Sequence, residues 1–441
     1  MRSCSKTIEP SHPSHHQHHQ YHRRNSSSSS SSINNIAITM TSPAETPKPI
    51  RETTHPPLIL NPNKRVPLLK TATHHPDPEP VLPVAHSKHH PTRKQQQPQP
   101  AATAASSLGE APPGSGSGSG YVYFIGTATT VIEYGGARVL TDPNFLHAGD
   151  HVHLGPGVTA RRLTNPAVPD LASLPPVDCV LLSHYHEDHF DRDVERQLSR
   201  DIPIVTTPHA KGCLTDAGKG QEGGSGGPFR RVWGVDAFEG VLMPIVEEEI
   251  QRDTTESGTE AATGEGKKRK RRAVRVTGMP GKHVPPGPLA KVNELLGAVP
   301  PTNGWLVELG WTTSTAEVTE RSEEPFETGY RIYISGDTLM VDELKEIPKR
   351  LRGDKIDLML VHLGGTTIPG PNMPLIMVTM DGKQGVQLMR LVDPDVTVPI
   401  HFDDYDVFCS PLDDFKKEVE AAELGDKVVY LNRGDQFEFS F

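Results

Sequence analysis

A short run, VDCVLLS at residues 177–183, constrains the fold most strongly, because almost every side chain on both of its faces is apolar. Such a strand is buried on both sides, as in a sheet that other layers cover. Similar strand-like segments occur from YVYFIG (121–126) to KVVYLNRGDQFEF (427–439), and segments with helical spacing lie between them. The pattern predicts an α/β architecture with helices outside two central sheets.

Residues 1–118 lack this pattern. They hold 12 of the 22 histidines, a serine run from Ser26 to Ser32 and repeated Pro and Gln, and PPGSGSGSG at 112–120 is typical of a flexible linker. This composition cannot bury enough apolar surface to offset the entropy lost on ordering. We therefore predict a disordered low-complexity tail and linker over residues 1–118 and one folded domain over residues 119–441.

Charge separates the same two regions. Residues 121–441 carry 33 basic and 49 acidic side chains, a net charge of −16, which disfavours nucleic acid as a partner. The basic run KKRKRR at 267–272 is the exception, and it follows an acidic stretch rich in Gly, Ser and Thr. We interpret residues 247–272 as a solvated loop inserted between strands, with a nuclear import signal as the alternative for the basic run.

Four cysteines, Cys4, Cys179, Cys213 and Cys409, are widely spaced and indicate reduced thiols in an intracellular, cytoplasmic protein. No apolar run approaches the roughly 18 residues of a membrane-spanning helix. The apolar segment TTIPGPNMPLIMVTM at 366–380 is either an ordinary packed loop or a peripheral membrane contact that could admit lipid. No sequence feature selects an oligomeric state.

The buried strand at 177–183 ends in the cluster SHYHEDH at 183–189. His184 and His186 are two residues apart, so both rings leave the same face of an extended segment, while Asp188 and His189 follow at the start of a helix. Four ligands cannot close two metal sites, so the hypothesis requires further ligands at later strand ends. Three such residues follow in order: His283, Asp337 and His401.

Together, the motifs TDP, SHYHEDH, MPGKH, SGD and PIH resemble the metallo-β-lactamase superfamily, which implies a four-layer αββα sandwich over residues 121–441. They are most similar to the branch of L-ascorbate-6-phosphate lactonase and N-acylphosphatidylethanolamine phospholipase D. The resemblance implies that Asp337 bridges two ions and that Asp142 orients the ligand loop. It further assigns one ion to His184, His186 and His283, and the other to Asp188, His189 and His401.

Two divalent ions that lie about 3.5–4 Å apart share a bridging hydroxide, which acts as a nucleophile at neutral pH. The sequence thus predicts a hydrolase of a small ester, lactone or phosphodiester, and in its most specific form a lipid phosphodiesterase of the phospholipase D type. Donors that are all His or Asp favour two Zn²⁺ ions and tolerate Mn²⁺. Asp188, Asp337 and His362 are the candidate catalytic residues. His362 either faces the metal pocket as a proton donor or substrate contact, or is a structural histidine.

Two alternatives belong to other classes: a nuclease of the same superfamily, and a non-catalytic binding protein that the metal stabilises. Several positions differ from the phospholipase relatives, among them Thr379, where those relatives carry a histidine. Asp381 is expected to be a helix cap. Asp404 and Tyr405 either form hydrogen bonds around the metal site or with substrate, or lie in a surface loop.

Overall fold

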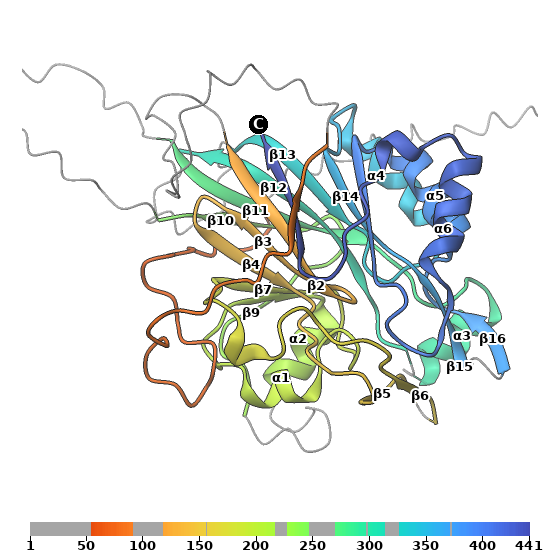
Figure 1. The fold of residues 1–441 in the computed structure, drawn as a ribbon, viewed down its shortest axis with the longest axis horizontal. Coiled ribbons are helices and arrows are strands. Elements are labelled where there is room, and N and C mark those ends of the chain that lie inside the picture. Colours follow the sequence, from red (N-terminus) through yellow and green to blue (C-terminus); the bar gives the residue numbers. More distant parts are fainter. Residues whose placement is uncertain are drawn as a thin grey trace, which may run out of the picture. The chain divides into compact units, whose positions relative to one another are not determined.

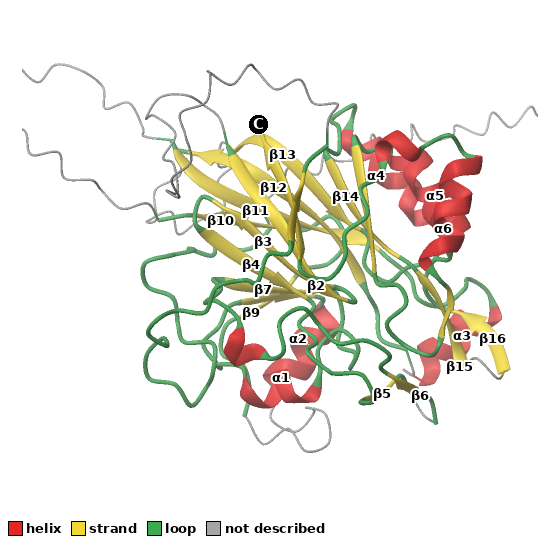
Figure 2. Ribbon diagram, viewed as in Figure 1, coloured by secondary structure: helices red, strands yellow, loops and turns green. Residues whose placement is uncertain are grey.

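The computed structural model describes residues 54–90, 118–155, 157–216, 227–246, 270–296, 299–313, 326–370 and 373–441. All of them fall within one compact unit, Pro47–Phe441. Two large sheets lie in the middle of this unit, and helices cover them from outside (Figures 1 and 2). The predicted four-layer αββα sandwich of the metallo-β-lactamase type is confirmed.

The first sheet has eight strands in the order β1-β19-β2-β3-β4-β7-β8-β9. Their bounds are β1 His86–Lys88, β19 Asp435–Ser440, β2 Ser119–Gly126, β3 Thr129–Tyr134, β4 Ala137–Thr141, β7 Cys179–Leu182, β8 Ile204–Thr206 and β9 Val232–Gly234. The second sheet has six strands in the order β10-β11-β12-β13-β14-β17. Their bounds are β10 Gly240–Pro244, β11 Arg271–Pro280, β12 Asn303–Thr312, β13 Phe326–Ile334, β14 Leu358–His362 and β17 Val396–Ile400.

Two smaller sheets consist of β16-β15-β18 and β5-β6. Their strands are β5 His151–His153, β6 Thr159–Arg161, β15 Gly364–Gly370, β16 Met373–Met377 and β18 Phe408–Ser410. The α-helices are α1 Arg192–Gln197, α2 Pro208–Thr215, α3 Pro288–Leu296, α4 Glu346–Leu351, α5 Gly382–Val392 and α6 Leu412–Ala421. Short 3-10 helices occur at Leu171–Ser173, Asp342–Lys345 and Gly425–Lys427. Among the described helices, none is both long and apolar enough to cross a bilayer.

Parallel pairing decides where polar strand ends meet. In the first sheet β4, β7, β8 and β9 pair in parallel, and in the second sheet β13, β14 and β17 do. Parallel strands direct their carboxyl ends to the same edge of a sheet. The segments that follow β4, β7, β13, β14 and β17 are therefore brought together, and these segments contain most of the predicted site residues.

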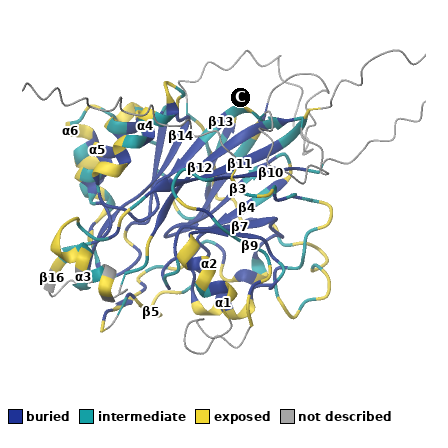
Figure 3. Ribbon diagram, turned by 180° about the vertical axis from the view of Figure 1, so that it is seen from behind, coloured by how far each residue is buried: buried dark blue, intermediate teal, exposed yellow. Residues whose placement is uncertain are grey.

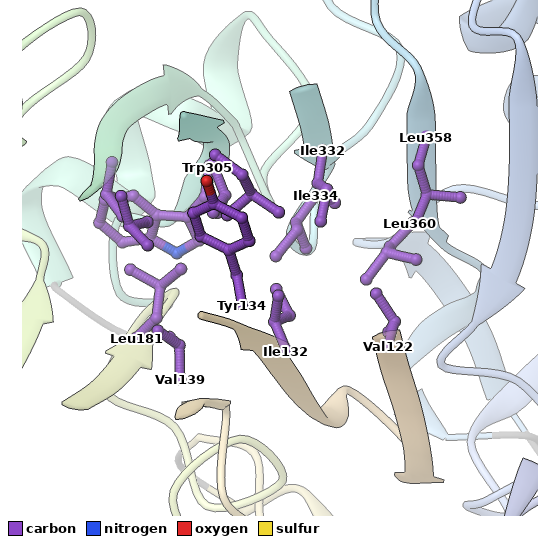
Figure 4. Packing of buried hydrophobic residues seen from close by; sticks show 14 of the residues in the cluster. Val122, Ile132, Tyr134, Val139, Leu181, Trp305, Ile332, Ile334, Leu358 and Leu360 are labelled. Atoms are coloured by element: carbon purple, nitrogen blue, oxygen red, sulfur yellow. The ribbon is translucent and has the colours of Figure 1, made fainter. Parts of the chain in front are cut away.

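The main core lies between the two sheets. Figure 4 shows side chains of the first sheet, such as Ile132 and Leu181, against side chains of the second, such as Trp305 and Ile334. All four of these side chains are almost fully buried. Burial of an aliphatic side chain contributes about 1.5–3 kcal/mol, so this interface is a major source of stability.

Helices form the outer layers (Figure 1). Val194 of α1 and Leu214 of α2 pack in a second cluster on the outer face of the first sheet. The helices α4, α5 and α6 cover the outer face of the second sheet, where Val386 and Phe415 are buried. Figure 3 shows the resulting pattern, with buried strands and helices that are exposed on one side.

The predicted helix cap at Asp381 is confirmed at the start of α5. Asp381 Oδ1 accepts a hydrogen bond of 2.8 Å from the backbone N–H of Gln384, as the Asp-x-x-Gln pattern predicted. At α6 the N-cap position is Pro411, without a side-chain cap. Ser410 instead accepts a hydrogen bond of 3.1 Å from Gly382 N, so its hydroxyl supports the start of the neighbouring helix α5.

The predicted disorder of residues 1–118 is wrong for residues 54–90, which pack along the domain as an extended strap. Leu58 and Leu60 are buried in the main core, and their N–H groups donate to Leu242 and Pro244 of β10. The strap ends in β1, which pairs in parallel with β19. Composition averaged over 118 residues hid these few leucines. The remainder of the predicted tail, residues 1–53 and 91–117, lies outside the described residues.

The predicted inserted loop at 247–272 ends earlier than expected. Residues 247–269 lie outside the described residues, but β11 begins at Arg271, which pairs with Thr312 of β12. Lys270 forms an ion pair with Glu327. The last residues of the basic run are thus part of a strand, because alternation of Arg with apolar residues in RRAVRV suits a sheet with one polar face.

Candidate metal centre

Seven residues predicted as metal ligands come together at one edge of the two sheets. The loop after β7 contributes four of them, and one each follows β11, β13 and β17: His184, His186, Asp188, His189, His283, Asp337 and His401. Their donor atoms form three overlapping groups, and within each group all atoms lie within 4.8 Å of one another. One group holds Asp188, His189, Asp337 and His401; the others are His184, His283, Asp337 and His184, His186, Asp188.

Asp337 lies at the centre of this arrangement. Its Oδ2 is 3.3 Å from His189 Nε2, 3.5 Å from His401 Nε2 and 3.9 Å from His283 Nε2. His184 Nε2 and His283 Nε2 are 3.0 Å apart. One carboxylate oxygen therefore lies between two sets of imidazole nitrogens, which is the geometry that a bridging ligand requires.

The outer nitrogens of the rings are engaged by the protein. His283 Nδ1 lies 2.9 Å from the carbonyl oxygen of Val378, and His401 Nδ1 lies 3.0 Å from that of Leu363. A carbonyl oxygen can only accept, so Nδ1 of each ring must donate its proton there. In a neutral ring, Nε2 is then left with a lone pair directed toward the centre, as in metal-binding histidines.

Asp142 and Ser183 hold the ligand loop in place. Asp142 Oδ1 accepts a hydrogen bond of 2.7 Å from Ser183 N, and its Oδ2 lies 3.3 Å from His189 Nδ1. The hydroxyl of Ser183 lies 2.9 Å from His184 Nδ1. Asp142 thus fixes both the backbone of the loop and one ring, which is the position that the family resemblance implied for it.

Several inner nitrogens have no partner. The buried Nε2 atoms of His186, His189 and His401 make no hydrogen bond with any described residue. Buried polar atoms are rarely left unsatisfied, so such a cluster requires an explanation. A divalent cation provides one, since it would accept every lone pair at once, and the set of imidazoles and carboxylates fits Zn²⁺ or Mn²⁺.

Electrostatics in the metal-free protein agree with this interpretation. Burial lowers the pKa of His283 to about 4 and holds the pKa of His184 well below its ordinary value, so both rings are neutral. Burial also opposes charge on His189, but the carboxylates of Asp337 and Asp188 outweigh it and raise the pKa of His189 well above its usual range. His189 must therefore release a proton before its Nε2 can act as a ligand.

His362 contacts the carboxylate of Asp337. It ends β14, its side chain is fully buried, and its Nδ1 lies 2.9 Å from Asp337 Oδ1. Thr379 donates a hydrogen bond of 3.0 Å to the other oxygen, Oδ2. Of the two readings for His362, the one that brings it to the metal pocket agrees with this placement. Sequence reasoning missed Thr379, which was noted only as the position where a histidine is absent.

Three other predicted positions, Asp381, Asp404 and Tyr405, have different structural roles. Asp404 and Tyr405 are buried rather than part of a surface loop, whereas Asp381 is the cap of α5.

Among the seven candidate ligands, His186 has the most exposed side chain, at 15%. Substrate would therefore approach from the side of His186. The β15–β16 hairpin follows His362 along the chain, and Leu375 on β16 is 68% exposed.

Comparison with known proteins gives a family match. The model for the beta-lactamase superfamily domain matches residues 121–295. A metal-dependent hydrolase of Thermodesulfovibrio yellowstonii is 22% identical over 283 residues, which cover 62% of this chain and 81% of that protein. The mitochondrial N-acyl-phosphatidylethanolamine-hydrolyzing phospholipase D of Saccharomyces cerevisiae is 32% identical over 100 residues, 22% of this chain and 20% of that protein.

Coverage differs among the matches. The chain spans 41% and 42% of the length of two archaeal metal-dependent hydrolases, from Methanosarcina mazei and Archaeoglobus fulgidus. Among solved structures, isothiocyanate hydrolase from Delia radicum gut bacteria aligns with a TM-score of 0.48 and 17% identity, over 73% of this chain and 100% of that one.

Proposed function

Residues 121–295 belong to the beta-lactamase superfamily, and from this premise we propose that the protein is a dinuclear metal-dependent hydrolase. One observation carries the proposal: seven His and Asp side chains converge at one buried point, and three of their inner nitrogens make no hydrogen bond with any described residue. Relatives that are named metal-dependent hydrolases support it.

Following the family resemblance, we assign His184, His186 and His283 to a first ion and Asp188, His189 and His401 to a second, with Asp337 shared. Two of the three groups agree with this division, whereas His186 groups with His184 and Asp188. When bound, two divalent ions lower the pKa of a shared water toward neutrality and supply a hydroxide nucleophile. The donor set contains no thiolate, which favours Zn²⁺ and tolerates Mn²⁺.

The protein's own groups prepare this site. Asp337 is held on one oxygen by His362 and on the other by Thr379, so its orientation is fixed before ions bind. Asp142 and the carbonyls of Val378 and Leu363 fix three imidazole rings. Preorganised groups in a buried site lower the cost of reorganisation during the reaction. His362 Nδ1 donates to Asp337 Oδ1, which can only accept, and burial lowers the pKa of His362, so its buried Nε2 carries a lone pair. We therefore propose His362 as a substrate contact rather than as a proton donor.

We propose a small ester, lactone or phosphodiester as substrate. A phospholipid phosphodiester is the most specific form, supported by the similarity of 100 residues to a phospholipase D. Exposed aliphatic side chains on segments connected to the site, Leu375 on β16 and Leu289 on α3, fit an apolar substrate. His283 connects both segments to the site: it precedes α3 along the chain, and its Nδ1 contacts the carbonyl oxygen of Val378, the residue that follows β16.

The test combines metal analysis with activity. The full chain is purified, its zinc and manganese content is measured, and turnover of chromogenic phosphodiester, lactone and thioester substrates is followed with and without a chelator. Two ions per chain and chelator-sensitive turnover of one class would support the proposal and define the bond. Fewer than one ion per chain after metal repletion, together with no turnover, would contradict the proposal of a dinuclear hydrolase.

Two other functions predict different results. A nuclease should cleave labelled RNA or DNA with activity that falls steeply with salt. A non-catalytic protein with a structural metal should show no turnover of any substrate and should lose stability when Asp337 is replaced. The net charge of −16 over residues 121–441 disfavours the nuclease.

We place the protein inside the cell, in the cytoplasm. Cys179 and Cys409 form no disulfide with any described residue, which fits a reducing compartment. Fractionation of cells that express the tagged full chain tests this placement, and recovery in the nucleus would favour the import signal at residues 267–272.

A further inference from the structure

We propose that Asp404 is a positioning residue that holds His401 at the second ion through the backbone of Thr127. This proposal rests on the proposed dinuclear site. It concerns a side chain that binds no ion in our assignment, and it predicts that the two ion sites respond differently to its loss.

Two residues beside the metal centre adopt unfavourable backbone conformations. Thr127 has φ of +49° and His401 has φ of +59°, in the left-handed region. Side chains with a Cβ disfavour this region, and β-branched ones such as Thr do so most. Both conformations must be maintained by contacts with the rest of the protein. One contact joins them directly, since His401 N donates a hydrogen bond of 2.8 Å to the carbonyl oxygen of Thr127.

Asp404 fixes the other side of Thr127. Its Oδ2 accepts a hydrogen bond of 2.9 Å from Thr127 N. The carboxylate therefore holds the peptide N–H of Thr127 while the carbonyl of the same residue holds His401. Asp404 is fully buried, so no solvent molecule competes for this oxygen.

The second oxygen of Asp404 anchors the carboxylate itself. Arg433 Nη2 donates to Oδ1 at 2.5 Å, Thr164 donates to the same oxygen, and Arg162 Nη2 lies 3.6 Å away. Arg162 is fully buried, and this ion pair with Asp404 contributes to the compensation of its charge. The carboxylate is thus fixed by segments far apart in sequence, and it transmits that rigidity to the turn between β2 and β3.

Loss of the carboxylate should act on one ion site. Without it, Thr127 N loses its hydrogen-bond acceptor and Arg162 loses its ion pair with Asp404, so the strained turn can relax. The ring of His401 would then move relative to Asp188 and Asp337, its nearest acidic neighbours. The first ion depends instead on residues after β7 and β11, which Asp404 does not contact in any described hydrogen bond or ion pair.

The test measures metal affinity rather than turnover. Full-length wild type, Asp404→Ala and Asp404→Asn are stripped of metal, and Zn²⁺ binding is followed by competition with a chromogenic chelator, with far-UV circular dichroism as a check of folding. We expect two ions in the wild type. In Asp404→Ala one ion should bind as in the wild type and the other about 10- to 100-fold more weakly. Asp404→Asn, which can still accept from Thr127 N, should lose less.

Glu308→Gln is the matched control. Glu308 is also a buried carboxylate between two arginines, Arg275 and Arg331, but it lies within the six-stranded sheet. This variant should be less stable and should still bind both ions with wild-type affinity. If Asp404→Ala binds both ions as the wild type does, or if Glu308→Gln weakens the second ion equally, the assignment is wrong.

Two further outcomes are also decisive. If Asp404→Ala does not fold, Asp404→Asn is judged by the same criteria. If the wild type binds a single ion, the dinuclear proposal fails. In that case, unchanged affinity of the Asp404 variants for that ion would also contradict the proposed role of Asp404, and weaker binding would support it.

Discussion

Two buried clusters of charged residues in this protein differ in how their charge is balanced. The candidate metal centre lies at one edge of both sheets, whereas the arginine cluster, formed by Arg275, Glu308 and Arg331, lies within the six-stranded sheet. In the arginine cluster the three residues are direct cross-strand neighbours on β11, β12 and β13. Glu308 accepts from Arg275 Nε at 2.7 Å and from Arg331 Nε at 3.2 Å, so positive and negative groups meet each other.

The metal centre is not balanced in this way. The Nδ1 atoms of His283 and His401 donate to backbone carbonyl oxygens. The Nε2 atoms of His186, His189 and His401 make no hydrogen bond with any described residue. Buried charge alone is therefore a poor indicator of a functional site. A cluster that leaves lone pairs unsatisfied requires something from outside, and a cluster that pairs all of its charges is complete without it.

Replacement of Asp337 should give the largest effect. Asp337→Ala removes the carboxylate that two of the three ligand groups share. We expect kcat to fall by about 10³-fold or more, the scale on which preorganised electrostatic groups act in catalysis. Steady-state kinetics at saturating Zn²⁺ measure this. Turnover within tenfold of wild type would mean that the metal centre is not the catalytic site.

Replacement of Glu308 should affect stability alone. Glu308→Gln leaves two guanidinium groups facing a neutral amide in a buried position. We expect the free energy of unfolding to fall by about 3 kcal/mol, because breaking a buried pair leaves charge uncompensated. Urea denaturation measures it, with kcat as the second readout. A loss of kcat at unchanged stability would abolish the distinction between the two clusters.

Acid should weaken metal binding. In the metal-free protein the pKa of His189 is raised well above its usual range, despite burial, by Asp337 and Asp188, so a metal ion must displace its proton near neutral pH. As pH falls, more protons compete, and Zn²⁺ affinity should drop by about tenfold per pH unit for each proton released. Competition titrations between pH 6 and pH 8 measure the slope. An affinity independent of pH would contradict this charge balance.

Asp381 provides the smallest effect and a control close to the site. Asp381→Ala removes only the N-cap of α5. We expect a loss of about 1 kcal/mol in the free energy of unfolding, with metal affinity and kcat unchanged. Thermal unfolding and metal titration measure the two quantities. A tenfold fall in kcat would assign Asp381 to substrate binding rather than to capping.

Much of the site could be predicted from sequence because its signals are local. The spacing of His184, His186, Asp188 and His189 after a buried strand indicates ligands that leave one loop, and Asp337 and His401 follow strands of the same apolar type. The cap at Asp381 is likewise a pattern of four residues. Such features depend on strand and helix periodicity, which neighbouring residues determine.

The tertiary contacts of these residues could not be predicted from local sequence patterns. Thr379 and His362 hold Asp337 from segments 42 and 25 residues away. Asp404 reaches Thr127 across 277 residues, and Leu58 and Leu60 of the strap enter a core formed mainly by residues after 118.

The sequence by itself thus determined the layered α/β fold and the ligand set, because apolar periodicity and polar strand ends are local properties. Only the tertiary structure decided that Asp404 is buried, that His362 contacts Asp337 and that the arginine cluster pairs its charges. The reason is physical: strand order and pairing bring together side chains from distant segments, and no local pattern specifies which of them meet.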